Sequence, residues 1–163
     1  MAALDKIYSK ILQYDDLQVK LKKWKEEGSK IVFTNGCFDI IHRGHIELLA
    51  QAANLGDKLI IGLNSDSSIQ KIKGVERPIL DEKSRAVLLA SLSFSDAIIT
   101  FHEETPLNLI NLILPAILVK GNDYKTAPII GQDIVENTGG KVILLPFVDG
   151  ISTSKIIDKI KNY

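Results

Sequence analysis

Short apolar runs alternate with amphipathic segments along most of the chain. Five apolar runs of four to seven residues predict strands, at residues 31–34, 58–64, 97–100, 117–120 and 141–145. The segments that follow them have apolar residues at helical spacing and predict helices, at residues 45–55, 81–92, 106–114, 129–138 and 153–161. Strands that alternate with helices indicate a parallel sheet with helices on both faces. The pattern therefore predicts an α/β fold with a doubly wound, five-stranded parallel sheet.

Residues 1–28 precede this pattern and are expected to form an N-terminal helical arm. Leu17, Leu21 and Trp24 recur at helical spacing among lysines and glutamates, with a break expected near residues 14–16. Residues 29–163 then form a single globular, Rossmann-like domain. We expect the arm either to pack on this domain or to mediate formation of a homodimer.

Composition and charge exclude several classes of protein. The chain has 163 residues, enough for one domain with a real core. Its 20 basic and 20 acidic residues cancel, which argues against general binding to nucleic acid or to a membrane surface. The lone Cys37 can form no internal disulfide, and the N-terminus lacks the apolar run of a signal peptide. We therefore expect a cytoplasmic protein without a membrane span.

The loop after the first predicted strand carries the most informative residues. Residues 34–39 are Thr-Asn-Gly-Cys-Phe-Asp, and His42 and His45 follow where a helix is expected to begin. Free backbone N–H groups at a helix start favour anions, and side chains three residues apart share one helix face. Gly44 lacks a side chain and allows a flat ligand to approach the helix. This arrangement predicts a phosphate site.

Four of the residues in the segment 34–39 have an expected task. Gly36 permits a tight turn that other residues would strain. Thr34 and Asn35 offer side-chain hydrogen bonds at the strand end. Asp39 is expected to hold the turn or to orient a histidine.

Other interpretations of this loop remain open. His42 and His45 would be ordinary surface residues, and Gly36 merely a turn, if no ligand bound there. A metal site built from Cys37, Asp39, His42 and His45 is less favoured, because structural zinc sites use other spacings. Cys37 as a nucleophile is weaker still. The dinucleotide and Walker glycine patterns do not follow the strand.

The loop after the second predicted strand combines polar residues with cations. Asn64 and Asp66 end the strand, and Lys71, Lys73 and Arg77 follow within a predicted loop. These cations are suited to neutralising phosphates, although a solvated loop explains them equally well. A further cation, in the next predicted helix, is Arg85, which would either reach the phosphates or pair with an acid.

Two later loops carry similar chemistry. Lys120 and Gly121 lead into Asp123 and Tyr124, which are suited to recognising a ring or a sugar, although an ordinary turn is the alternative. After the fifth strand, residues 152–154 are Ser-Thr-Ser, a good helix N-cap that would also provide a second phosphate site.

These motifs resemble the signature of the HxGH nucleotidyltransferases, a cytidylyltransferase-like superfamily. From about residue 15 to the C-terminus, the chain is most similar to the heptose 1-phosphate adenylyltransferase domain of ADP-heptose synthases. The segment from Lys120 to Tyr124 resembles the heptose enzymes in particular. The kinase domain that often precedes this domain is absent from the sequence, so the resemblance is to the stand-alone form.

The resemblance implies transfer of a nucleotide from ATP to D-glycero-β-D-manno-heptose 1-phosphate. The products would be ADP-heptose, a precursor of lipopolysaccharide core or a related surface glycan, and pyrophosphate. Mg²⁺ would be held mainly by the triphosphate, without a dedicated set of protein ligands.

The same resemblance assigns roles to individual residues. The catalytic residues would be His42, His45 and Lys73. The nucleotide-binding residues would be Thr34, Asn35, Gly36, Cys37, Phe38, Gly44, Lys120, Gly121, Ser152, Thr153 and Ser154. The residues that bind the sugar phosphate would be Asp39, Asn64, Asp66, Lys71, Arg77, Asp123 and Tyr124.

The alternative substrates are CTP and glycerol 3-phosphate, because residues 150–153 also match the glycerol-3-phosphate cytidylyltransferases. Those enzymes usually have an arginine shortly before this segment, and residues 146–149 contain none. Two hypotheses from other classes are a nucleotide-binding module without catalysis and an interaction protein built on residues 1–28. Pyrophosphate release separates the first of these from an enzyme.

Overall fold

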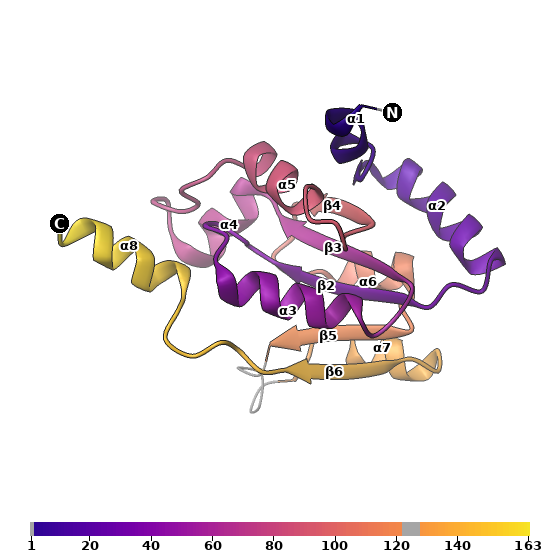
Figure 1. Ribbon diagram of the computed structural model, residues 1–163. Coiled ribbons are helices and arrows are strands. Elements are labelled where there is room, and N and C mark those ends of the chain that lie inside the picture. Colours follow the sequence, from indigo (N-terminus) through magenta and orange to yellow (C-terminus); the bar gives the residue numbers. More distant parts are fainter. Residues whose placement is uncertain (1, 122–127) are drawn as a thin grey trace.

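The structure is a computed structural model that describes residues 2–121 and 128–163. Within them, six parallel strands form one sheet in the order β1-β4-β3-β2-β5-β6 (Figure 1). The strands are β1 (Ile11–Leu12), β2 (Ile31–Gly36), β3 (Lys58–Asn64), β4 (Ala97–Phe101), β5 (Ile117–Gly121) and β6 (Lys141–Leu145). The predicted parallel α/β architecture is confirmed, whereas the predicted count of five strands is wrong.

Helices cover both faces of this sheet. They are α1 (Ala3–Tyr8), α2 (Tyr14–Glu26), α3 (Arg43–Ala53), α4 (Asp66–Lys73), α5 (Glu82–Ala90), α6 (Leu107–Ile113), α7 (Gln132–Asn137) and α8 (Thr153–Lys161). Helices α3 and α5 pack on one face, and α2, α6 and α7 pack on the other. This is the predicted doubly wound arrangement. Helix α8 extends away from the sheet, at the left of Figure 1.

The additional strand, β1, comes from the N-terminal segment, which the sequence predicts to be helical. Residues 11–12 pair with residues 98–99 of β4. Lys10 Nζ also donates a hydrogen bond to the carbonyl oxygen of Leu92 at 2.8 Å. Two adjacent apolar residues are too few to show a periodicity of their own, so the sequence pattern did not distinguish this strand from the helices α1 and α2 on either side. The N-terminal segment therefore contributes an edge strand as well as helices.

Residues 66–73, expected to lie in a loop, form helix α4. Ser65 caps the helix by accepting a hydrogen bond from the N–H of Ser68 at 3.1 Å, and Ile69 is fully buried. Gly74 follows the last turn with a φ of 92°. A short helix with one buried apolar side chain gives little periodic signal, which explains the error.

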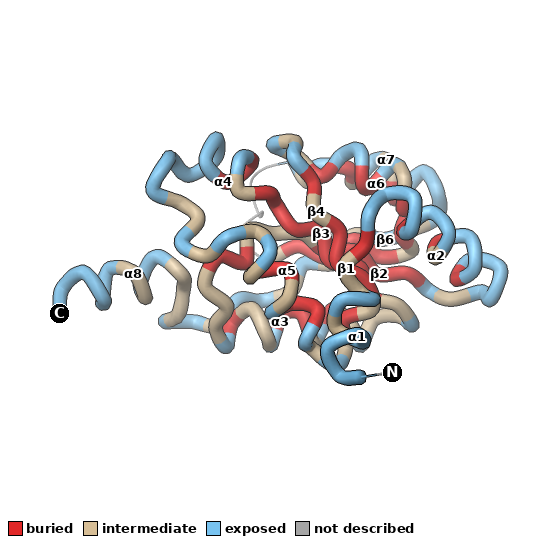
Figure 2. The backbone as a smooth tube through the Cα atoms, turned by 90° about the horizontal axis from the view of Figure 1, so that it is seen from above, coloured by how far each residue is buried: buried red, intermediate tan, exposed pale blue. Residues whose placement is uncertain are grey.

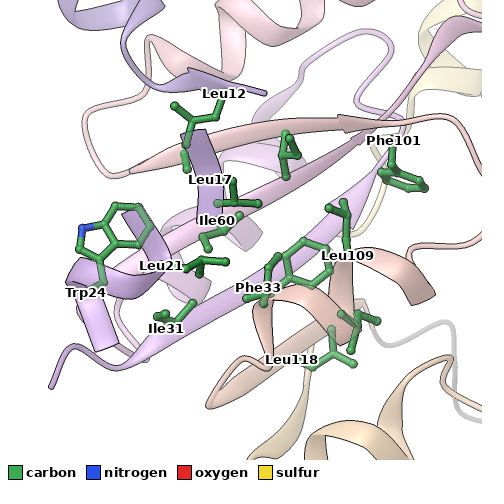
Figure 3. Packing of buried hydrophobic residues seen from close by; sticks show 14 of the residues in the cluster. Leu12, Leu17, Leu21, Trp24, Ile31, Phe33, Ile60, Phe101, Leu109 and Leu118 are labelled. Carbon is green, nitrogen blue, oxygen red and sulfur yellow. The ribbon is translucent and has the colours of Figure 1, made fainter. Parts of the chain in front are cut away.

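The first core cluster lies between the sheet and helices α2, α6 and α7 (Figure 3). Leu17, Leu21 and Trp24 of α2 belong to it, as their spacing predicts. Phe33 of β2 and Leu109 of α6 lie in the same cluster. Buried apolar contact of this kind is the main term that holds α2 against the sheet.

The second core cluster lies on the opposite face, under α3 and α5. Leu49 of α3 and Leu89 of α5 are fully buried there, with Val32 and Ile61 from the central strands. Val32 and Phe33 are neighbours in β2 and belong to opposite clusters, because successive side chains of a strand point to opposite faces. The continuous apolar runs of the sequence thus reflect burial on both faces.

Strand β2 lies at the point where the strand order reverses. It pairs with β3 on one side and with β5 on the other. In Figure 2 the strands around it are buried, whereas the surrounding helices expose their outer sides. Ligands of open parallel sheets bind beyond the carboxyl ends of the strands at such a reversal. The loops that follow β2 and β5 are therefore the first places to look for a site.

Candidate active site

A cavity of about 420 Å³ lies at this reversal. From β2, the loop after it and α3, the cavity is lined by Thr34, Asn35, Gly36, Cys37, Phe38 and His45. From other elements come four further predicted residues, Asn64, Lys73, Lys120 and Gly121. The structure thus brings together residues that span nearly ninety positions of the sequence, as the predicted topology requires.

The imidazole rings of His42 and His45 are stacked at the start of α3. Their centroids lie 3.8 Å apart with 20° between the ring planes, and the edge of Phe38 approaches His45. The Nδ1 atoms of both histidines are buried, and no described residue forms a hydrogen bond with either. Buried polar atoms normally have partners, so these two nitrogens are candidates for contact with a ligand.

Burial favours the neutral form of both imidazoles. It lowers the pKa of His42, and it lowers the pKa of His45 to about 4, with smaller contributions from the charges of His42 and Lys73. Neutral imidazoles can still donate a hydrogen bond. A bound anion would favour their charged forms and raise both pKa values.

Gly36 and Gly44 each lie close to the aromatic ring of a neighbouring residue. Gly44 is buried beside the His42 ring, and a Cβ at this position would lie 3.2 Å from His42 Nδ1. A Cβ at Gly36 would lie 3.0 Å from the Phe38 ring. Both glycines therefore leave room for the rings of their neighbours, in addition to any ligand.

Asp39 joins the loop after β2 to the loop before α5. Its buried carboxylate accepts hydrogen bonds from Arg77 Nε at 2.6 Å, from the N–H of Ile79 at 2.7 Å and from the N–H of Leu80 at 3.0 Å. Burial alone would raise the pKa of Asp39, but these donors outweigh it and lower the pKa. Asp39 thus secures a neighbouring loop, and among the described residues none of its hydrogen bonds is with a histidine.

Arg77 and Asp39 lie outside the lining of the 420 Å³ cavity. The Arg77 Nε is engaged by Asp39, while its Nη2 is buried without a hydrogen-bond partner among the described residues. Their assigned contacts with the sugar phosphate stay predictions.

Arg85 is fully buried and ties together the loops around the cavity. Its Nη1 donates to the carbonyl oxygens of Cys37 at 2.7 Å and Asn64 at 2.8 Å, and its Nε donates to that of Leu80 at 3.0 Å. Its Nη2 pairs with Asp66 at 2.7 Å. Of the two alternatives for Arg85, the structure shows pairing with an acid.

Asp66, predicted to bind substrate, faces a different hollow. Together with Tyr8, Tyr14 and His102 it lines a second cavity, of about 780 Å³, beside β1. Its carboxylate pairs there with the Arg85 guanidinium. A contact between Asp66 and substrate stays a prediction.

Residues 152–154 stand at the start of α8, next to the start of α3. Ser152 caps α8 by accepting a hydrogen bond from the N–H of Lys155 at 3.2 Å, as predicted. Thr153 Oγ1 donates to the carbonyl oxygen of Ile40 at 3.3 Å, just before α3. These residues do not line the cavity in the free protein, and neither does Lys71. The two helix starts nevertheless adjoin, as a bound triphosphate would require.

Lys120 is buried at the end of β5, and its Nζ donates to Asn35 Oδ1. Thr34 Oγ1 donates to the carbonyl oxygen of Val119 at 3.1 Å, which fixes the same two strand ends together. The other predicted residues of this segment, Asp123 and Tyr124, lie outside the described residues.

Sequence reasoning missed several residues of the cavity. They are Leu48, Ile72, Glu104, Pro106, Ile130 and Phe147. Glu104 and Phe147 had a usable signal, because each follows a predicted strand at the carboxyl edge of the sheet. The others are apolar residues of helices or loops, and nothing in their local sequence distinguishes them from core residues.

The donor set of the site fits an anion rather than a cation. Among the residues that the structure describes, no three of His, Cys, Asp and Glu are grouped to hold a metal ion. Asp39, one member of the metal site considered above, is already engaged by Arg77 and two backbone N–H groups. Burial raises the pKa of the Cys37 thiol, which argues against a thiolate nucleophile.

Several known proteins are similar to this chain in sequence or in fold. Residues 33–159 match the family model described as cytidylyltransferase-like. The bifunctional protein HldE of Geobacter metallireducens is 50% identical over 152 residues, which cover 93% of this chain and 31% of that protein. HldE of Geotalea uraniireducens is 47% identical over 154 residues, 94% of this chain and 31% of the relative. The chain thus spans about a third of the length of these curated relatives.

Two solved structures are similar as well. A lipopolysaccharide core biosynthesis protein from Thermoplasma volcanium is 30% identical with a TM-score of 0.62, over 74% of this chain and 98% of that one. Pantoate-beta-alanine ligase from Francisella tularensis, solved with beta-gamma ATP and beta-alanine, has a TM-score of 0.64 over 94% of this chain and 78% of its own. Its 15% identity shows a shared fold alone.

The chain belongs to the cytidylyltransferase-like family. It is a nucleotidyltransferase, and the resemblance found in its sequence is confirmed. In the described part of the chain, no helix has the length and apolar character needed to cross a membrane.

Proposed function

We propose that this chain transfers the adenylyl group of ATP to D-glycero-β-D-manno-heptose 1-phosphate, producing ADP-heptose and pyrophosphate. The observation that carries the proposal is the stacked pair of His42 and His45, whose buried Nδ1 atoms lack partners among the described residues. They lie at a helix start at the sheet reversal, beside a cavity that contains Lys73. The similarity to HldE over nearly the whole chain supports heptose 1-phosphate as the acceptor.

The proposed reaction is an in-line displacement at the α-phosphorus of ATP. An oxygen of the sugar phosphate forms the new P–O bond, and the bond to the bridging oxygen of the β-phosphate breaks. The electron pair of that bond leaves with pyrophosphate. The attacking phosphate is already ionised near neutral pH, so the reaction needs no general base. Catalysis is therefore mainly positioning and stabilisation of charge.

Each part of the site has a task in this reaction. The imidazole N–H groups of His42 and His45 donate to phosphate oxygens as negative charge shifts toward the leaving group. The free backbone N–H groups at the start of α3 favour the same anion. Lys73 supplies positive charge from the last turn of α4.

The start of α8 provides a second set of phosphate ligands in this proposal. Ser152 and Thr153 would contact the outer phosphates, which would span from one helix start to the other. Mg²⁺ bound to the triphosphate would neutralise charge on the phosphates and leave most of its coordination to phosphate oxygens and water. The imidazoles and lysines of the site fit such a complex, because they bind the anionic oxygens.

The choice of ATP and a heptose over CTP and glycerol 3-phosphate rests on two sequence segments. Residues 120–124 resemble the heptose enzymes, and residues 146–149 lack the arginine of the cytidylyltransferases that use glycerol 3-phosphate. We also propose a homodimer, which sedimentation velocity would test directly.

The deciding experiment measures pyrophosphate release with Mg²⁺, with each of ATP and CTP combined with each of heptose 1-phosphate and glycerol 3-phosphate. We expect release with ATP and heptose 1-phosphate alone. Release only with CTP and glycerol 3-phosphate would assign the alternative activity. Protection of the protein by ATP against thermal unfolding, without release in any combination, would indicate a binding module without catalysis.

A further inference from the structure

Phe147 is an aromatic residue of the cavity that the proposed chemistry does not use. It follows β6 and keeps 51% of its surface exposed, yet it lines the same cavity as His45 and Lys73. Its ring lies against Gly121 at the end of β5, where a Cβ would collide with the ring. The tip of the ring, at Cζ, Cε1 and Cε2, therefore lies against the backbone of Gly121, and about half of the residue's surface remains available for contact with a ligand.

Both sides of the cavity have a mixed lining. Polar or charged Asn64, Lys73 and Glu104 stand with apolar Ile72 and Pro106 after β3 and β4, and Lys120 stands with Ile130 and Phe147 on the β5 and β6 side. Of the two phenylalanine rings in this lining, Phe38 is buried and Phe147 is half exposed. A phosphorylated sugar requires polar partners for its hydroxyl groups, whereas a flat heterocycle is best held by an aromatic face. The half-exposed ring of Phe147 is therefore the part of the lining best suited to a nucleobase.

We propose that Phe147 is the nucleobase-binding residue, and that the base of ATP stacks on its exposed ring at the β5–β6 side of the cavity. This inference rests on the proposed function, since it assigns one substrate of that reaction to part of the site. The phosphates then extend from the base toward His42 and His45, and the sugar phosphate approaches from the side of Lys73 and Glu104.

The stacking role can be separated from a packing role by changing the ring conservatively. Phe147→Leu keeps an apolar side chain at this position but removes the aromatic face, whereas Phe147→Tyr keeps the face. Because Phe147 is half exposed, both variants are expected to fold, which their thermal unfolding will show. Tyr163→Leu, at a residue that is 97% exposed and outside the cavity lining, is the matched loss of an aromatic ring.

The experiment measures dissociation constants of the full chain for ATP and for inorganic tripolyphosphate, by calorimetry with Mg²⁺. Tripolyphosphate has the phosphates of ATP without the base. Loss of base stacking should weaken ATP binding by about 5- to 150-fold in F147L. Tripolyphosphate binding should not change, and F147Y and Y163L should bind ATP like the wild type.

Three results would overturn the assignment. F147L could weaken ATP and tripolyphosphate equally, which would make the ring a support for the phosphate site. F147L could bind ATP as well as the wild type does. The wild type could bind tripolyphosphate as tightly as ATP, which would remove any base subsite. ATP binding that depends on Phe147, in a protein that releases no pyrophosphate, would instead refute the proposed function and support the base subsite.

Discussion

Arg85 Nη1 donates a hydrogen bond to the carbonyl oxygen of Cys37 at 2.7 Å, and so joins helix α5 to the loop that carries the histidines. The same guanidinium reaches the end of β3 and the loop before α5. A buried side chain outside the cavity lining thus holds the loop that follows β2. On the proposed function, Arg85 is therefore a positioning residue and makes no contact with the substrates.

Replacing Arg85 should therefore destabilise the protein. R85M leaves the carbonyl oxygens of Cys37 and Asn64 buried without a donor, and it leaves Asp66 without its cation. The Asp66 carboxylate is 40% exposed, so the main loss is of the donors to the backbone carbonyl oxygens. We expect the free energy of unfolding to fall by about 2–4 kcal/mol. Urea denaturation measures this change, and K83A on the exposed side of the same helix is the control. Equal midpoints for R85M and K83A would contradict the positioning role.

His45 should be required for turnover and not for folding. Loss of a preorganised donor to a developing charge typically lowers kcat by about 10²–10³-fold. We expect H45A to show a loss of at least this size in pyrophosphate release, with thermal unfolding still cooperative. The exposed His102 lies outside the first cavity, so H102A should keep the wild-type rate. Turnover of H45A close to wild type would refute the proposed mechanism.

Acid should destabilise the free protein through His45. Its pKa falls from 6.5 to about 4 on folding, mainly because of burial, so the unfolded chain binds more protons between these values. Protonation of His45 therefore does not lower the free energy of unfolding above pH 6.5, and it lowers this free energy progressively as the pH falls from 6.5 toward 4. We expect H45Q to lose less stability than the wild type between pH 7 and pH 5, in urea denaturation at each pH. Identical losses would show that His45 does not titrate in this way. The lowered pKa of Asp39 acts in the same direction but below its usual value of 3.8.

Lys73 should act on binding through its charge. It lines the cavity, whereas the exposed Lys22 of α2 does not. We expect K73A to raise KM for one or both phosphate-bearing substrates, and K22A to leave both constants near wild type. Steady-state kinetics with each substrate varied in turn will show which phosphate Lys73 contacts. If K73A and K22A behave alike, the prediction of a phosphate contact for Lys73 is wrong.

The N-terminal segment should contribute to the stability of the whole sheet. Leu17 is fully buried against the first core cluster, while Val19 on the same helix is 71% exposed. L17A should lower the free energy of unfolding by about 2–5 kcal/mol, and V19A should have little effect. Denaturation of both variants by urea tests this. A small effect of L17A would mean that α2 moves independently of the sheet.

The sequence was informative wherever a residue's task depends on its neighbours in the chain. The histidines at the start of α3 and the cap at Ser152 follow local rules, and the structure places them as predicted. The parallel sheet followed from the alternation of apolar runs and amphipathic segments.

Other features depend on contacts between distant residues, which no local pattern contains. Strand β1 forms because residues 11–12 pair with the edge of β4. Arg85 pairs with Asp66, which is nineteen positions away in the sequence. Phe147 belongs to the cavity because Gly121 lies beneath its ring. Tertiary pairing determined each of these.

The hydrogen bond from Thr153 to the carbonyl oxygen of Ile40 joins positions 113 residues apart. The two helix starts meet only after nearly the whole chain has been synthesised and arranged, because contacts of long sequence separation form at a large cost in chain entropy. On the proposed function, a triphosphate that touches both helix starts would act as a tether between an early and a late part of the chain. The substrate would then help to hold α8, which has no buried residue of its own, against the rest of the protein.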